Sequence, residues 1–154
     1  MHKKFLYSSA IAIIFLSSVV WYTQSHRVQK IDTRISQVTI GGHTFVVTLA
    51  KTADEHERGL SGKKSMSQNE GMLFVFENNG LYSFWMKDML FPLDIVWIDE
   101  NNKIVHVEEN LLPQTYPKSF ISKELAKYVL ELNGGIVRKN SIRVGDKVRF
   151  SKIN

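Results

Sequence analysis

Cysteine is absent from the 154-residue sequence. The chain therefore forms no disulfide, thiolate nucleophile or cysteine metal site, and the absence suits an oxidising compartment, where free thiols are a liability. Long basic runs are also absent, because no run of Lys or Arg exceeds a pair and the net charge is only +5. Basic and aromatic residues do not alternate along any stretch, so we expect no nucleic-acid partner.

Internal repeats and low-complexity tracts are missing as well. A chain of this length corresponds to about one domain. We expect three parts along it: a signal or anchor segment over residues 1–25, a polar tether over residues 26–35, and a β-rich extracytoplasmic domain over residues 36–154.

The first part contains an uncharged, mostly apolar run over residues 5–22, behind two lysines. As a helix this run would cover about 27 Å, close to the ~30 Å hydrocarbon core of a bilayer. A cleavable signal peptide needs small residues before the cut, for which Thr23 and Ser25 are poor substitutes, whereas Trp21 and Tyr22 suit the far interface of a retained anchor. We therefore favour an uncleaved anchor. The lysines stay cytoplasmic, which sends the domain to the periplasmic or cell-surface side.

The large apolar residues concentrate in the middle of the chain, in three short runs rich in Val, Ile, Phe and Trp: residues 71–76, 82–87 and 92–99. Asn78-Asn79-Gly80 and Leu90-Phe91-Pro92 separate the runs, and both segments favour turns. The pattern predicts three consecutive strands of one sheet.

Two local signals precede these runs. Gly41-Gly42 lies between two alternating segments and predicts a hairpin whose glycines accept positive φ. Thr52 and Glu55 form a capping-box pattern, which predicts a short helix that ends near Arg58 with Gly59 as its left-handed cap. Further strands are expected at residues 103–108, 128–132 and 147–150, with one helical turn at 136–140 and a long irregular stretch at 111–123.

Together the elements predict a mainly β (α+β) fold. Seven or eight short strands with little helix favour a small closed or semi-closed β-barrel-like domain with one or two short helices, preceded by an N-terminal transmembrane helix. Closure into a barrel would hide the unpaired edges of the strands.

Several blocks of this sequence, in this order, resemble the hallmarks of the domain-of-unknown-function 192 family. The resemblance spans about Val38 to Phe150 and rests on Arg58-Gly59-Leu60-Ser61-Gly62, Glu70-Gly71-Met72-Leu73-Phe74-Val75-Phe76, Ser83-Phe84-Trp85-Met86-Lys87, Pro92-Leu93-Asp94-Ile95, Tyr128-Val129-Leu130-Glu131-Leu132-Asn133 and Val144-Gly145-Asp146. It implies a compact β-rich domain, frequently behind a signal or a membrane anchor in bacteria, and it brings no established activity, substrate or cofactor.

The sequence departs from that family pattern at two places. Asp88-Met89 stands where Asn-Thr is usual, which puts a negative charge beside Lys87. Asn140-Ser141 stands where a glycine is usual, and we expect Asn140 to tolerate the left-handed conformation there.

Asp94 is the first candidate site residue, because it begins a strand whose next four residues are apolar. A buried carboxylate must be paired, hydrogen-bonded or neutral. Arg58 is a plausible partner, and an ion pair between them would hold the short helix against the sheet. The alternative is a carboxylate that binds a ligand or transfers a proton.

Trp85 and Lys87 are the second pair of candidates, because they share one face of their strand while Phe84 and Met86 share the other. If Phe84 and Met86 point inward, Trp85 and Lys87 form a surface that stacks a flat ligand and pairs an anion. A Trp85 that only covers one end of the barrel is an equal alternative.

No metal site and no cofactor is expected from the pattern. His106 and Glu108 alternate onto one strand face, but two scattered histidines without a dense motif are usually surface residues. A serine triad is disfavoured too, because the sequence contains no Gly-x-Ser-x-Gly elbow.

We expect a membrane-tethered extracytoplasmic binding or accessory module of the cell envelope. It would hold a small polar envelope ligand, or a segment of a partner protein, near Arg58, Trp85, Lys87, Asp94, Glu109 and Tyr116. Whether it is also an enzyme stays open: a hydrolase of envelope polymers that uses one carboxylate as acid or base is one alternative. A structural partner of another membrane protein is the other.

Overall fold

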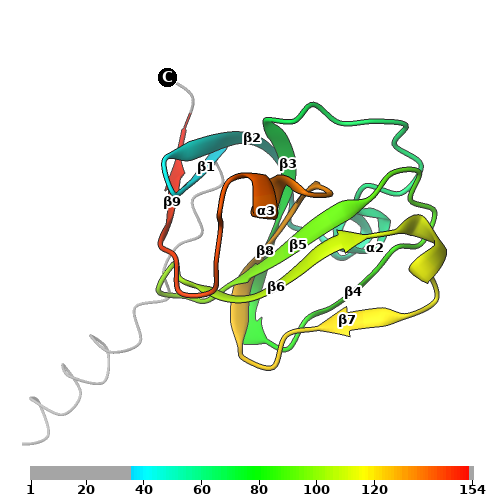
Figure 1. Ribbon diagram of the computed structural model, residues 1–154. Helices are drawn as coiled ribbons and strands as arrows, with labels where there is room; N and C mark the ends of the chain where they lie inside the picture. The colour runs from blue at the N-terminus through cyan, green and yellow to red at the C-terminus, as the bar shows by residue number, and fades with distance from the viewer. Residues whose placement is uncertain (1–35, 153–154) are drawn as a thin grey trace, which may run out of the picture. The chain divides into compact units, whose positions relative to one another are not determined.

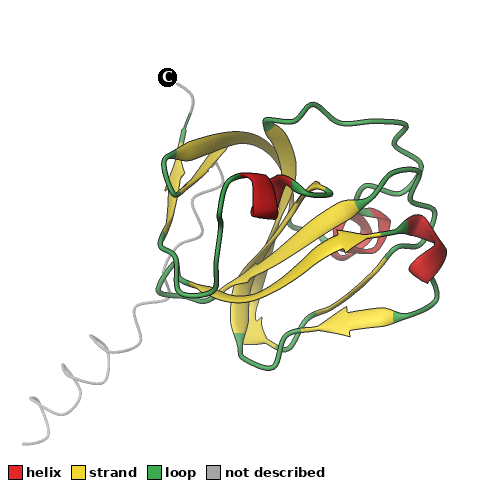
Figure 2. Ribbon diagram, in the orientation of Figure 1, coloured by secondary structure: helices red, strands yellow, loops and turns green. Residues whose placement is uncertain are grey.

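The computed structural model describes residues 36–152, which form a mainly β domain (Figures 1 and 2). Seven strands make one sheet in the order β6-β5-β8-β3-β2-β1-β9, and two more make the separate β4–β7 ribbon. The strands are β1 (Gln37–Ile40), β2 (His43–Ala50), β3 (Glu70–Gly80), β4 (Ser83–Trp85), β5 (Leu93–Ile98), β6 (Ile104–Leu111), β7 (Ser119–Ile121), β8 (Ala126–Asn133) and β9 (Val148–Ser151). The large sheet curls into a half-barrel (Figure 1).

The half-barrel is only partly closed. Just before its edge strands β6 and β9 begin, Lys103 and Lys147 form an isolated bridge that connects the two edges. Beside that bridge the Ile104 amide donates to the carbonyl oxygen of Asp146 at 3.0 Å, and the Gly145 amide donates to the carbonyl oxygen of Ile104 at 2.8 Å. The expectation of a barrel-like body therefore holds in its semi-closed form.

The predicted hairpin at Gly41-Gly42 is confirmed. Strands β1 and β2 are antiparallel, with Ile40 opposite His43, and the two turn glycines have φ values of 56° and 85°. Residues with a Cβ rarely adopt such angles, so the turn depends on glycine. On its other side β1 pairs with β9, which brings the two ends of the domain together.

The predicted helix is α2 (Ala53–Arg58), and its capping box is present. The Glu55 amide donates to the Thr52 hydroxyl at 3.3 Å, and the Thr52 amide donates to the Glu55 carboxylate at 2.9 Å. Backbone hydrogen bonds from Lys51 and Thr52 lower the pKa of Glu55. Gly59 ends the helix with φ 48° and ψ −131°, so the positive φ was predicted correctly but the cap is not left-handed helical.

The prediction of three consecutive strands in one sheet is wrong. Strand β3 continues through the expected turn as far as Gly80, which pairs with Ala126. Strand β8 separates β3 from β5, and β4 leaves the sheet to pair with β7. Apolar runs indicate where strands are, but their pairing depends on a strand that comes some 30 residues later in the chain.

The face of the sheet under the β4–β7 ribbon carries an aromatic core. Phe84 of β4 meets Phe74 of β3 and Trp97 of β5 edge to face, with ring centroids 4.8 and 5.9 Å apart. Phe120 of β7 belongs to the same buried cluster. The stretch predicted to be irregular thus supplies β7, together with a 3-10 turn over Pro113–Thr115.

The opposite face of β5 supports α3 (Ile136–Lys139), the helical turn expected at 136–140. Just after it, Asn140 has φ −99° while Ser141 has φ 54°. The left-handed residue of this turn is therefore Ser141, not Asn140 as the sequence suggested.

The expected membrane segment at 5–22 and the tether at 26–35 lie outside the described residues. Among residues 36–152 no helix combines the length and apolarity that crossing a membrane requires.

Candidate functional site

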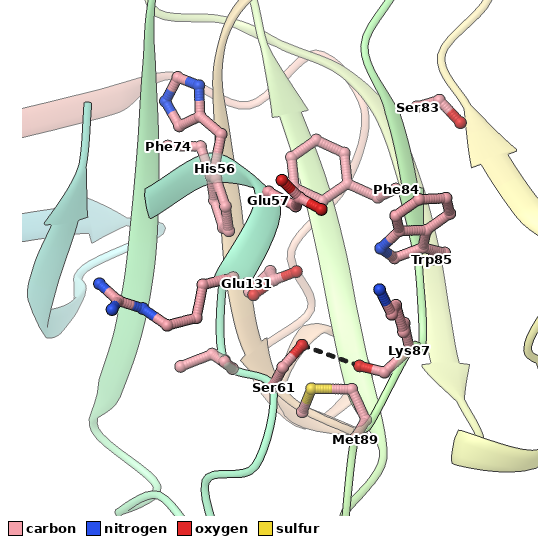
Figure 3. Close-up of a pocket in the computed structure, with 13 residues that line it drawn as sticks. His56, Glu57, Ser61, Phe74, Ser83, Phe84, Trp85, Lys87, Met89 and Glu131 are labelled. Carbon is pink, nitrogen blue, oxygen red and sulfur yellow. Dashed lines mark hydrogen bonds between the residues drawn. The ribbon is translucent and has the colours of Figure 1, made fainter. Parts of the chain in front are cut away.

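A pocket of about 300 Å³ opens between α2, the turn that follows it, and the strands β3, β4 and β8. Figure 3 shows its lining side chains converging from these elements, with the Glu131 carboxyl among them. Its titratable and charged residues are His56, Glu57, Arg58, Lys87 and Glu131.

Glu131 is the most unusual member of the pocket. It is 4% exposed, and its Oε2 has no hydrogen-bond partner. Burial raises the pKa of Glu131 to about 8, because the charged form loses its hydration. The carboxyl is therefore mainly protonated and neutral at pH 7.

The register of the sheet determines where Glu131 points. On β8 it lies directly opposite Ile95 of β5, and cross-strand partners in an antiparallel pair share one face. Ile95 and Trp97 belong to the cluster beneath the β4–β7 ribbon, so Glu131 lies on that face. Its neighbours Leu130 and Leu132 alternate to the other face.

Gly59 leaves room above the Glu131 carboxyl. A Cβ at this position would lie 3.3 Å from Cζ of Phe74 and 3.9 Å from Oε2 of Glu131. Any side chain here would extend over the carboxyl oxygen, and the φ of 48° would strain it. The glycine at the end of α2 thus both stops the helix and keeps the pocket open.

The predicted alternation along residues 84–87 is confirmed. Met86 is buried and Phe84 packs inward, while Trp85 is 44% exposed. Trp85 and Lys87 both line the pocket, and Nζ of Lys87 lies 5.9 Å from the centroid of the Trp85 ring. Together they form one wall that carries an aromatic surface and a cation.

Two hydrogen bonds hold this wall against the turn after α2. The Ser61 hydroxyl donates to the carbonyl oxygen of Lys87 at 2.9 Å, and the Gly62 amide donates to the carbonyl oxygen of Asp88 at 2.9 Å. Asp88 has φ 55°, a conformation that Asp tolerates better than most residues. This departure from the family pattern is therefore compatible with the same turn.

Asp94 lies on the other face of the sheet, and it does not line the pocket. It is fully buried, and its carboxylate accepts the amides of Asn110 at 2.7 Å, Gly135 at 2.9 Å and Val137 at 2.7 Å. The suggested ion pair with Arg58 is absent among the described residues, since Arg58 lies in the pocket. Asp94 holds α3 and the end of β6 against β5.

The remaining predicted site residues divide between the pocket and the far side. Arg58, Trp85 and Lys87 all line the pocket, and the Tyr116 ring lies edge to face against Trp85 at 6.3 Å. Glu109 is not part of the lining. It accepts a hydrogen bond from Nε of the exposed Arg138 at 3.2 Å.

His106 and Glu108 face one another as their spacing on β6 predicts, with Nε2 and Oε1 3.3 Å apart. In the part of the chain that the structure describes, no group of three His, Asp or Glu residues is arranged to hold a metal.

Sequence reasoning missed Glu131, although one signal was available. It is the single acid in the run Tyr128-Val129-Leu130-Glu131-Leu132, whose other members are apolar. Such an acid must either point to solvent or be buried with the rest of its strand. Strand β8 is buried on both faces, so the acid is buried. A lone acid in a fully buried strand is therefore a site candidate.

The geometry defines a class: a mainly β half-barrel with a lateral pocket built around a neutral, buried carboxyl group. The sequence model of DUF192, described as "Uncharacterized ACR", matches residues 36–150. The chain belongs to the DUF192 family, as the resemblance of its motifs indicated.

Solved structures with the same fold are similar along most of their length. A protein described as a candidate transcription regulator from Sinorhizobium meliloti is 32% identical with a TM-score of 0.71, over 74% of this chain and 92% of that one. A protein of unknown function from Novosphingobium aromaticivorans is 29% identical with a TM-score of 0.71, over 79% of this chain and 90% of that one. No curated protein matches.

Proposed function

We propose that this chain is a membrane-tethered extracytoplasmic binding module that holds a small polar ligand of the cell envelope in the Glu131 pocket. The observation that carries the proposal is the unpartnered Oε2 of Glu131 inside that pocket. A buried polar atom without a hydrogen bond is unfavourable for folding. Such groups concentrate at binding and catalytic sites, where a ligand supplies the missing partner.

The wall of the pocket supports the same function. Trp85 offers an exposed ring on which a flat or cyclic ligand stacks, and Lys87 and Arg58 offer charge for an anionic group. The extracytoplasmic location rests on the N-terminal sequence, in which two lysines precede an apolar run long enough to span.

The test is a thermal-unfolding screen of the full chain against muropeptides, short glycans, nucleotides and divalent metals with and without chelator. A ligand at ~100 times its dissociation constant stabilises a protein by about 2.7 kcal/mol, which raises Tm by roughly ten degrees in a domain of this size. We expect such a shift for one class of small polar ligand. An unchanged Tm across the panel would argue for a protein partner instead.

A pair of variants ties the shift to the pocket. Trp85→Ala removes the exposed stacking ring and should weaken binding about tenfold. Ile121→Ala removes a side chain of similar exposure, 50% against 44% for Trp85, on the neighbouring strand and outside the pocket lining. It should bind like the wild type, and equal losses in both variants would place the ligand elsewhere.

A hydrolase of envelope polymers is the second candidate, because a carboxyl with a pKa of about 8 is protonated at neutral pH and suits a general acid. Glu57 lines the same pocket as a second carboxyl group. Turnover of peptidoglycan fragments should fall at least ~100-fold in Glu131→Gln and persist in Glu77→Gln, which removes an exposed acid of β3. Turnover that survives in Glu131→Gln would exclude this mechanism.

A further inference from the structure

The Glu131 oxygen without a partner is enclosed by apolar groups. Gly59 and the edge of the Phe74 ring lie beside it, and Phe84 packs edge to face on Phe74. None of these groups donates a strong hydrogen bond. A molecule that satisfies Oε2 must therefore supply the hydrogen-bond partner itself, and a partner that carries a positive charge would also favour the ionised form of the carboxyl.

Two basic side chains line the pocket beside the Glu131 carboxyl. Arg58 and Lys87 both line it, and neither forms a close ion pair within the described part of the chain, although the Arg58 charge contributes to the lowered pKa of Glu55. Glu57 is the one other acid in the lining, and His56 is tied to the carbonyl oxygen of Ala50 at 3.0 Å. The two cations would repel a ligand that is only positively charged, and they attract one that also carries an anionic group.

We infer that the ligand of this pocket is a small zwitterion, an amino acid or short peptide, whose ammonium group donates to Glu131 and whose carboxylate meets Arg58 and Lys87. The inference rests on the proposed function and names its ligand class. Ammonium groups are also favoured beside aromatic rings, which Phe74, Phe84 and Trp85 supply. A volume of about 300 Å³ suits an amino acid or a dipeptide rather than a polymer.

Binding of an ammonium group requires the ionised form of Glu131. The carboxyl of the empty pocket holds a proton below a pKa of about 8, so the ligand releases that proton when it binds. For a free amino acid, whose amine stays protonated over this range, affinity should therefore rise about tenfold from pH 6 to pH 7 and about fivefold more from pH 7 to pH 8. The α-amino group of a dipeptide itself loses its proton at about pH 8, so dialanine should gain less over the second step. His56, Glu57, Arg58 and Lys87 also line the pocket, and a Glu131 variant isolates the contribution of this one group because it leaves those four in place.

The experiment is titration calorimetry of the full chain at pH 6, 7 and 8. The probes are free amino acids and dialanine, each beside its N-acetylated form, which keeps the carboxylate and loses the ammonium group. We expect the free amines to bind and the acetylated forms to bind at least tenfold more weakly. Because a proton is released, the measured heat of binding should depend on the ionisation enthalpy of the buffer.

Two variants separate the roles of charge and fold. Glu131→Gln keeps the shape of the side chain and cannot ionise, so binding at pH 8 should weaken by about 10- to 100-fold and lose its pH dependence. Glu77→Gln removes an exposed acid outside the pocket and should reproduce the wild-type affinity at each pH.

Other results would overturn the inference in distinguishable ways. Equal binding of amine and N-acetyl forms, or affinity that falls as pH rises, would mean that Glu131 stays protonated and meets an uncharged group of the ligand. The binding function would then stand and the zwitterion would not. If none of these probes binds while a neutral glycan raises Tm, the binding function would likewise stand and the zwitterion would not. If no probe binds in the calorimetry and none raises Tm in the thermal screen, the binding function itself would be overturned.

Discussion

Replacement of Asp94 by Ala should lower the free energy of unfolding by about 3–5 kcal/mol, because three amide donors around a fully buried carboxylate lose their acceptor at once. Those donors belong to Asn110, Gly135 and Val137, at 2.7 to 2.9 Å from the carboxylate. In a domain of this size the loss corresponds to a decrease in Tm of roughly 15 °C. Thermal and urea unfolding of the full chain measure it.

Two further variants distinguish a structural Asp94 from a ligand-binding one. Asp94→Asn keeps one oxygen and turns an acceptor into a donor, so it should cost about 1–3 kcal/mol. Glu109→Gln breaks the ion pair with Arg138, whose side chain is 81% exposed, and should cost less than about 1 kcal/mol. An Asp94→Ala protein that unfolds like the wild type but no longer binds ligand would return Asp94 to the site.

Local signals in the sequence were sufficient wherever a few neighbouring residues determine the structure. The Gly41-Gly42 hairpin and the capping box of Thr52 and Glu55 were predicted and are present. In both cases the paired residues lie fewer than ten positions apart in the chain, so neighbouring residues determine the outcome.

Strand pairing depended on distant residues and was mispredicted. The large sheet places β8 between β3 and β5, so β3 and β5 are not adjacent strands. No local pattern specifies this order, because any strand that is apolar on both faces can occupy the centre of a sheet. The expected position of β4 beside β3 failed for the same reason.

The candidate site was predicted in part. Arg58, Trp85 and Lys87 line one pocket, and the alternation that gives Trp85 and Lys87 a common face was predicted from neighbouring residues. Asp94 was expected to pair with Arg58, but backbone amides 16 to 43 residues later in the chain supply its partners. Glu131 was missed because its strand was read as core. Alternation along β8 places Glu131 and Leu130 on opposite faces of the sheet. Which of the two faces carries the pocket follows only from the pairing of Glu131 with Ile95 on β5.

Glu131 should make the stability of this protein fall as pH rises, and Glu131→Gln should abolish that dependence. Burial raises the pKa of Glu131 from 4.5 to about 8 in the folded chain. Between those two values the unfolded chain releases the proton while the folded chain keeps it. The free energy of unfolding therefore decreases by about 1.4 kcal/mol per pH unit over this window.

This dependence on pH predicts how the free energies of unfolding of the wild type and Glu131→Gln compare at each pH. Below pH 4.5 the carboxyl is neutral in both states, so its contribution is fully present and Glu131→Gln should match the wild type. By pH 7 the wild type should have lost about 3 kcal/mol, so Glu131→Gln should be more stable by that amount. Urea unfolding at about pH 4, 5, 6, 7 and 8 measures the difference, with Glu77→Gln as the control for removal of one exposed acid.

A variant that is more stable and binds less well would explain why an acid occupies the middle of a buried strand. Desolvation of the carboxyl lowers the stability of the fold at neutral pH and leaves the group without a partner that a ligand can supply. A ligand that binds the ionised carboxyl restores part of the lost stability. Saturating ligand should accordingly stabilise the wild type more than Glu131→Gln at pH 7. A Glu131→Gln protein that is less stable than the wild type at pH 7 would instead mean that the carboxyl has a partner within the folded chain, and the pocket would lose its strongest claim to a ligand.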